Sequence, residues 1–82
     1  MRYPCPCCGF LTLDEAPPGS FGICPVCTWE DDNVQYADPN YQGGANGVSL
    51  KEARINFRTL GAATPDAVNR VRPPRPEEQA PS

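Results

Sequence analysis

Apolar positions recur at helical spacing in one long segment of this chain, residues 49–60. Ser49 and Glu52 have the spacing of a capping box, and Gly61 follows as a C-terminal stop. The apolar positions fall on one side of a helix, and basic positions form an adjoining stripe. The apolar stripe consists of Leu50, Ala53, Phe57 and Leu60, and the basic stripe of Lys51, Arg54 and Arg58. We therefore predict one C-terminal α-helix, which packs its apolar stripe on the rest of the chain.

Shorter apolar stretches predict a β-hairpin in the first third of the chain. Residues 11–13 alternate apolar and polar side chains, as a half-buried strand does, and residues 21–23 can return as a second strand. Residues 14–20 have the composition of a turn. Residues 29–48 combine acids with Asn, Gly and Pro, and predict irregular loops.

The chain beyond Gly61 has no strong periodicity. Residues 64–68 can form one further helical turn, and the Pro- and Arg-rich residues 73–82 are expected to be extended and mobile. We therefore divide the chain into a domain over residues 1–61 and a mostly extended, mobile tail over residues 62–82.

Two cysteine pairs are the candidate chemistry of the chain. The strings Cys5-Pro6-Cys7-Cys8 and Cys24-Pro25-Val26-Cys27 are separated by fifteen residues, a spacing typical of a tetrahedral four-cysteine zinc site. We predict that Cys5, Cys8, Cys24 and Cys27 bind Zn²⁺, with Fe as the alternative because thiolates accept both metals. The predicted fold is a small metal-stapled α+β domain, with zinc-ribbon or rubredoxin-like knuckles on a short β-hairpin, one C-terminal α-helix and irregular loops.

Cys7 is left over by this assignment. It is either a small residue of the first knuckle or a metal-adjacent thiol that senses oxidants. Thiol reactivity needs solvent access and a setting that stabilises the thiolate. The thiolates and acids nearby favour the first interpretation.

Composition agrees with a metal-bound domain. The chain has 82 residues, 39% of them hydrophobic, and eleven prolines, so its apolar core is small and needs a cross-link. Five cysteines cannot all pair within one chain, although disulfides remain the alternative cross-link. Neither a signal peptide nor a membrane helix is evident, so we expect a reducing cytoplasm, where metal binding is favoured over disulfides.

Charge and composition also exclude some function classes. Between Tyr3 and Leu50 there is no Lys or Arg but there are six acids, and a Zn²⁺ ion with four thiolates adds a formal charge of about −2. Such a field repels a phosphate backbone, so we expect no nucleic acid as a partner. We expect no membrane partner either, because no segment approaches the roughly 20 apolar residues of a membrane helix. The chain has no His, which excludes Cys–His and Ser–His pairs, and four cysteines close the metal shell. We therefore predict that it is not an enzyme.

An acidic segment follows the second cysteine pair. Trp29 is expected to pack over the metal site, while Glu30, Asp31 and Asp32 are expected to form a turn that faces solvent or a partner. Calcium loops alternate carboxylates with spacer residues, and this run does not. The basic helix stripe is expected to face these acids or water.

The chain resembles the bacterial cysteine-rich CPCC family over roughly residues 3–60. The resemblance rests on residues 3–10, on residues 24–27 with the following Trp29-Glu30-Asp31-Asp32, and on residues 43–50 continuing to about Phe57. It implies that the four paired cysteines form the metal site and that the Trp-Glu-Asp-Asp segment is a family feature. It implies no activity or substrate, and the chain from about Thr64 onward lies outside it.

These observations predict a small zinc-binding protein with a structural four-cysteine site. Its expected role is that of a protein-interaction module whose partner-binding residues are Trp29, Glu30, Asp31 and Asp32. An acidic surface of this kind favours another protein of basic character. The alternatives are a rubredoxin-like iron-thiolate electron carrier and a thiol or metal redox sensor that acts through Cys7.

Overall fold

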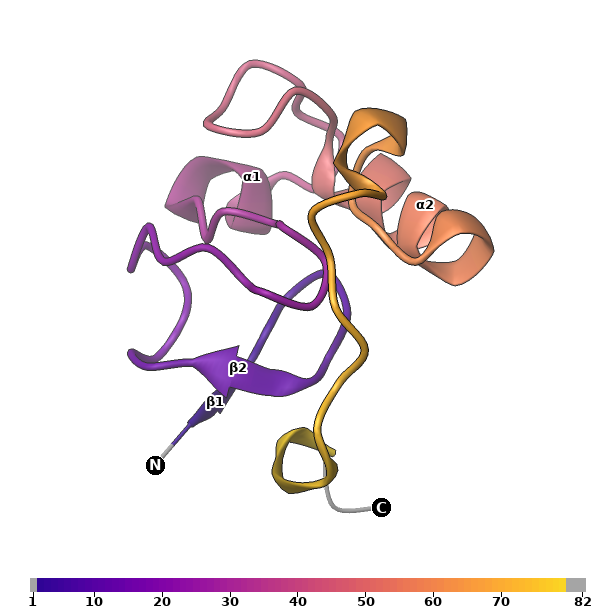
Figure 1. Cartoon of the computed structure of the whole chain (residues 1–82). Helices are drawn as coiled ribbons and strands as arrows, with labels where there is room; N and C mark the ends of the chain where they lie inside the picture. The colour runs from indigo at the N-terminus through magenta and orange to yellow at the C-terminus, as the bar shows by residue number, and fades with distance from the viewer. Residues whose placement is uncertain (1, 80–82) are drawn as a thin grey trace.

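Two short hairpins at the N-terminal end of the chain hold the cysteine pairs. The computed structural model describes residues 2–79. Strands β1 (Tyr3–Pro4) and β2 (Leu11–Leu13) form an antiparallel pair in which Tyr3 lies opposite Leu13. The first cysteine pair occupies the turn between these strands (Figure 1).

The hairpin pairing differs from the expectation that residues 11–13 pair with residues 21–23. Residues 21–23 instead pair with the chain that follows the second cysteine pair. The Phe21 N–H donates to the Asp31 carbonyl over 3.0 Å, and Ile23 forms an isolated bridge with Glu30. Each cysteine pair therefore lies in the turn of its own hairpin, because the chain reverses within the knuckle itself and does not need residues 14–20 to do so.

The predicted helix is confirmed as α2 (Leu50–Leu60). The Ser49 hydroxyl accepts a hydrogen bond from the Glu52 N–H, and Gly61 ends the helix with a φ of +79°. Leu50 and Ala53 are buried, whereas Leu60 at the far end of the predicted apolar stripe is 48% exposed. A second, shorter helix, α1 (Asn33–Ala37), was not predicted and lies in the segment expected to be irregular.

The hydrophobic core surrounds the cysteines. Trp29 is 1% exposed and packs in one cluster with the cysteines and with aliphatic side chains of β2 and α2. Phe10 and Phe57 pack against this cluster. Their two rings meet edge to face, with 6.2 Å between the ring centroids. The buried members of the cluster are Cys5, Cys7, Leu13, Cys24, Val26, Cys27, Trp29, Leu50, Ala53 and Ala63. The small metal-stapled α+β fold predicted from the sequence is thereby confirmed.

The segment after Gly61 packs on the domain, in contrast to the extended tail expected over residues 62–82. It contains two 3₁₀ turns, η1 (Pro65–Ala67) and η2 (Pro76–Glu78), and runs from α2 back to the first hairpin (Figure 1). Ala62, Ala63 and Ala67 are buried, because side chains this small let the backbone approach the second knuckle. Residues 80–82 lie outside the described part of the chain.

Arg72 and Glu78 hold residues 62–79 in place on the domain, and we call these residues the returning segment. Arg72 donates two hydrogen bonds to the Glu78 carboxylate, at 2.9 and 2.7 Å, and Glu78 is 2% exposed. The Arg72 N–H also donates to the carbonyl of Pro25 in the second knuckle, over 3.4 Å. The packed part of the chain therefore continues past residue 61 to η2.

Candidate metal centre

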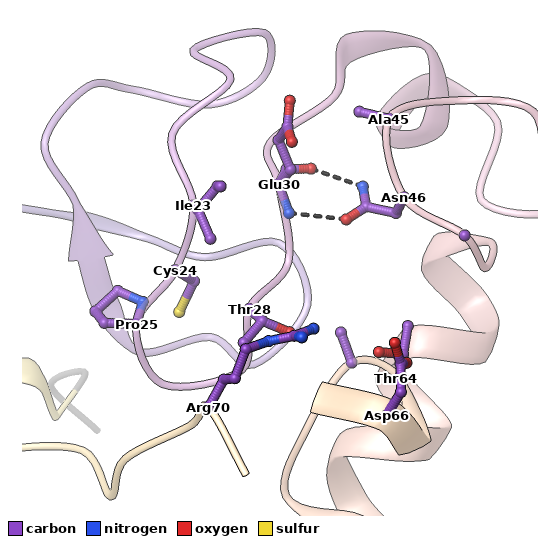
Figure 2. Close-up of a pocket in the computed structure, with 12 residues that line it drawn as sticks. Ile23, Cys24, Pro25, Thr28, Glu30, Ala45, Asn46, Thr64, Asp66 and Arg70 are labelled. Carbon is purple, nitrogen blue, oxygen red and sulfur yellow. Dashed lines mark hydrogen bonds between the residues drawn. The ribbon is translucent and has the colours of Figure 1, made fainter. Parts of the chain in front are cut away.

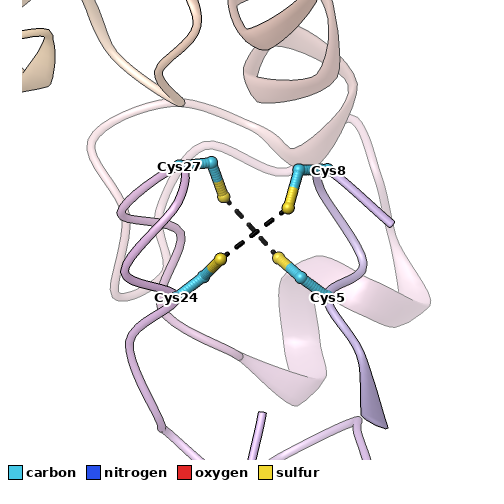
Figure 3. A group of neighbouring side chains, drawn as sticks. All are labelled: Cys5, Cys8, Cys24 and Cys27. Atoms are coloured by element: carbon cyan, nitrogen blue, oxygen red, sulfur yellow. Dashed lines mark hydrogen bonds between the residues drawn. The ribbon is translucent and has the colours of Figure 1, made fainter. Parts of the chain in front are cut away.

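Four cysteine sulfurs meet at the centre of the core. The Sγ atoms of Cys5, Cys8, Cys24 and Cys27 all lie within 4.8 Å of one another. Cys5 lies 3.6 Å from Cys27 and Cys8 lies 3.7 Å from Cys24, each pair joining one knuckle to the other (Figure 3). Tetrahedral ligands at a metal–sulfur distance of about 2.3 Å stand about 3.8 Å apart. The sulfur cluster therefore fits one tetrahedral metal ion.

The two knuckles share one backbone geometry. In the first, the Gly9 N–H donates to the Cys5 carbonyl over 2.8 Å, and in the second the Thr28 N–H donates to the Cys24 carbonyl over the same distance. Gly9 and Thr28 both have a positive φ, +82° and +73°. Thr28 thus adopts the left-handed conformation that the first knuckle gives to glycine, although side chains resist it.

Two donors outside the cluster reach the sulfurs. The Thr12 hydroxyl donates to Cys24 Sγ over 2.9 Å, and the Trp29 N–H donates to Cys27 Sγ over 3.4 Å. Such contacts orient thiolate ligands and offset part of their charge. Sequence reasoning did not single out Thr12, whose signal is its place as the polar residue between Leu11 and Leu13 of β2, where it is 5% exposed.

The four sulfurs lie close enough to hydrogen-bond with one another. Hydrogen bonds from the thiols of Cys27, Cys5 and Cys8 lower the pKa of Cys24, and the Thr12 hydroxyl adds to this effect. The hydrogen bond with Cys24 conversely raises the pKa of Cys27. Thiol ligands must lose their protons to bind a divalent metal, so the affinity of the cluster for a metal falls as the pH is lowered.

Cys7 lies outside the four-sulfur cluster. It is 8% exposed and packs within the hydrophobic core beside the knuckles. The structure thus places this thiol where solvent has little access. Its role as a sensor stays a hypothesis, and the low exposure disfavours it because thiol reactivity needs access.

Most of the segment expected to form an acidic, partner-binding surface is buried. This corrects the interpretation of Trp29, Glu30, Asp31 and Asp32 as partner-binding residues. Trp29 is 1%, Asp31 0% and Asp32 6% exposed, and only Glu30 is partly exposed. The physical reason is that both buried carboxylates accept hydrogen bonds within the fold. Asp31 Oδ2 accepts hydrogen bonds from the N–H and the hydroxyl of Ser20, at 2.9 and 2.7 Å.

Asp32 organises two segments at once. Its Oδ1 accepts hydrogen bonds from the N–H groups of Val34 and Gln35 and so caps α1, while its Oδ2 accepts one from Ala45 over 2.9 Å. The N–H groups of Gln35, Ala45 and Val34 lower the pKa of this carboxyl. Asp32 therefore acts inside the fold, where it ties the loop before α2 to α1.

A hollow beside the second knuckle has a volume of about 490 Å³. Its walls come from the knuckle, from residues 45–47 and from the segment of η1 (Figure 2). The Asn46 side chain closes one side by pairing with the backbone of Glu30, accepting from its N–H over 2.9 Å and donating to its carbonyl over 2.8 Å. Asn46 thus covers a strand edge that would otherwise be open.

The fold and the sulfur cluster define a small protein built around two cysteine knuckles that can bind one metal ion. Residues 3–78 match the family model described as Cysteine-rich CPCC, and the chain belongs to this family. The match extends through η2, beyond the residues 3–60 over which the resemblance was expected. No curated protein matches the chain. Within the described residues, none of the helices has the length and apolar character needed to cross a membrane.

Proposed function

We propose that this protein is a non-enzymatic zinc module that binds another protein, and that its four-cysteine site is structural. The observation that carries the proposal is that the sulfur cluster lies within the hydrophobic core, with Cys5, Cys24 and Cys27 at most 2% exposed. Four thiolates complete a tetrahedral shell, and structural zinc sites are closed in this way, whereas catalytic sites keep one position open.

The size of the metal contribution supports a structural role. Zinc contributes about 10–16 kcal/mol of apparent binding free energy to zinc-finger peptides, whereas a core of this size supplies about 3–5 kcal/mol. The free energy of metal binding is therefore larger than that of the core. A domain held in this way presents a rigid surface to a partner in a reducing cytoplasm, where thiolates persist.

Metal analysis tests the site. Native mass spectrometry is expected to find one zinc per chain in the parent and in Cys7→Ser, and none in Cys24→Ser. Chelation of the metal is expected to abolish cooperative thermal unfolding, followed by circular dichroism, because the apo chain lacks its main cross-link.

Three outcomes would contradict the proposal. Stoichiometric iron with visible absorption would establish the electron-carrier alternative, since the same thiolates accept iron. A chelated chain that still unfolds cooperatively would show that the metal is not structural. Loss of metal in Cys7→Ser would overturn the ligand assignment.

A further inference from the structure

Positive charge gathers on one exposed face of α2. Lys51, Arg54 and Arg58 are all exposed and line a hollow of about 390 Å³ together with Ile55, Pro39 and Asn40. We call this hollow the α2 groove. The helical period of about 100° per residue places positions i, i+3, i+4 and i+7 on one side, which is why the three cations converge beside Ile55.

Both walls of the α2 groove are fixed to the rest of the fold. Arg54 Nε donates to the carbonyl of Pro6 in the first knuckle over 2.9 Å, and the Lys51 N–H donates to the carbonyl of Pro39 over 2.9 Å. The groove is bounded by α2 at one side and by Pro39 and Asn40 of the loop before α2 at the other.

The cations of the groove have no acidic partner within the described residues. The ion pairs found there are made by Arg2 and Arg72, with Asp14 and Glu78. Asp38 lies close to the groove in the sequence, but its carboxylate accepts a hydrogen bond from the Asn40 N–H over 3.2 Å. Like charges spaced three and four residues apart on a helix repel one another. An anion bound over this face would therefore relieve that repulsion.

The positive charge of this face differs in sign from the net charge of the chain, and part of the negative charge is buried. The net charge is −3, yet three of the ten acidic side chains, Asp31, Asp32 and Glu78, are buried. The acidic character deduced from the sequence is thus partly internal. The α2 groove instead presents three positive charges together with Ile55, which is 44% exposed.

We propose that the α2 groove docks an acidic segment of a partner protein, in which carboxylates alternate with an apolar side chain. The proposal rests on the proposed function as a protein-interaction module and names its surface and the chemistry of its partner. Charge complementarity supplies the attraction, and Ile55 with Pro39 supplies an apolar contact. A nucleic acid fits less well, because a phosphate backbone extends past three cations onto a chain whose net charge is negative.

Fluorescence anisotropy of the zinc-loaded protein tests the groove. The probe is a short fluorescein-labelled peptide with pairs of glutamates separated by leucines, and its glutamine counterpart is the uncharged control. Lys51→Glu and Arg58→Glu are each expected to weaken binding about fivefold or more at low salt. Arg70→Glu makes the same charge change at an exposed arginine beside the other hollow, and is expected to bind as the parent does.

Melting temperature and metal content establish that each variant is folded. The proposal is overturned if the parent does not bind the acidic peptide, if the groove variants bind it as the parent does, or if single-stranded RNA or phosphatidylglycerol vesicles bind more tightly than the peptide.

Affinity purification distinguishes failure of the groove proposal from failure of the proposed function. If the parent and the groove variants recover the same partners equally, the groove proposal alone is contradicted. If the parent recovers no partner, the proposed function itself is contradicted.

Discussion

Single residues decide whether each knuckle can close. Gly9 and Thr28 occupy equivalent positions with φ of +82° and +73°, and both donate their N–H to the first cysteine of their own knuckle. No atom lies within 4 Å of a Cβ built on Gly9, so the backbone conformation alone favours glycine there. Thr28 keeps the same conformation because both cysteines of its knuckle must face the metal.

This equivalence predicts opposite effects of two substitutions. Gly9→Ala is expected to destabilise the metal-bound protein by about 1–2 kcal/mol, the cost of a left-handed side-chain residue. Thr28→Gly is expected to stabilise it by about 1 kcal/mol, because the same cost is relieved. Urea unfolding measures both.

Thr59→Gly in α2 is the control for the second substitution, and it should destabilise by about 0.3–0.5 kcal/mol, the difference in helix propensity between threonine and glycine. A Thr28→Gly protein less stable than the parent would mean that the threonine side chain contributes something in the knuckle that outweighs its backbone cost.

At the scale of elements, the loop before α2 owes its shape to Gln35 of α1. The Gln35 amide donates to the carbonyls of Tyr41 and Val48 over 3.0 and 2.9 Å, and its oxygen accepts from the N–H and the side chain of Asn46. Gln35 is 0% exposed. One buried side chain therefore satisfies four hydrogen bonds of a loop that has little regular structure.

The close approach of Gly44 to this amide gives a prediction. A Cβ on Gly44 would lie 2.6 Å from the Gln35 side chain, so Gly44→Ala is expected to destabilise the protein by about 1–3 kcal/mol. Gly47→Ala, where no atom lies within 4 Å of the added Cβ, is the matched control and should change stability little. Equal melting temperatures for the two variants would show that the loop yields without loss.

The elements that the sequence could predict are those with local signals. Helix α2 carries its own cap at Ser49 and its own stop at Gly61, so it was predicted to within a residue. The prediction that residues 11–13 pair with residues 21–23 was wrong. Both segments are suitable strands, and their partners are decided by the reversal of the chain within each knuckle. The role of Gln35 and Asp32 could not be predicted, because their partners lie up to thirteen residues away.

For the whole molecule, the returning segment joins the two ends of the described chain. Glu78 binds Arg72 and lies 3.9 Å from Arg2, so η2 packs beside the first hairpin. Composition alone predicted an extended tail here, because Pro and Arg are typical of solvated segments. The deciding features, three buried alanines and one buried carboxylate with an arginine partner, have no local pattern.

This pairing predicts a pH dependence. Hydrogen bonds from Arg72 lower the pKa of Glu78 from its usual 4.5 to about 2. A lowered pKa means that the folded state favours the carboxylate, so the stabilisation is fully present above about pH 4.5 and is lost as the pH falls towards 2.

Glu78→Gln is therefore expected to lower the melting temperature of the metal-bound protein by several degrees at neutral pH. Differential scanning calorimetry at neutral pH, where the thiolates keep the metal, measures the loss, and the same substitution in an Arg72→Gln background should cost less because the pair is already broken. The neighbouring Glu77→Gln, at an exposed carboxylate, is the control and should follow the parent throughout. An equal loss in the parent and Arg72→Gln backgrounds would show that Glu78 contributes through packing and not through its ion pair.

The order of the metal ligands along the chain has a consequence for biosynthesis. All four ligands lie between Cys5 and Cys27, and every element from α1 onward follows them. During translation at about 5–20 residues per second, the ribosome completes the ligand set about one to five seconds before it adds the first residue of α2. The nascent chain can thus capture its ion first and use the loaded site as the template on which the later segments fold. We therefore expect the supply of metal during translation to limit the yield of folded protein more than the hydrophobic content of the finished chain does.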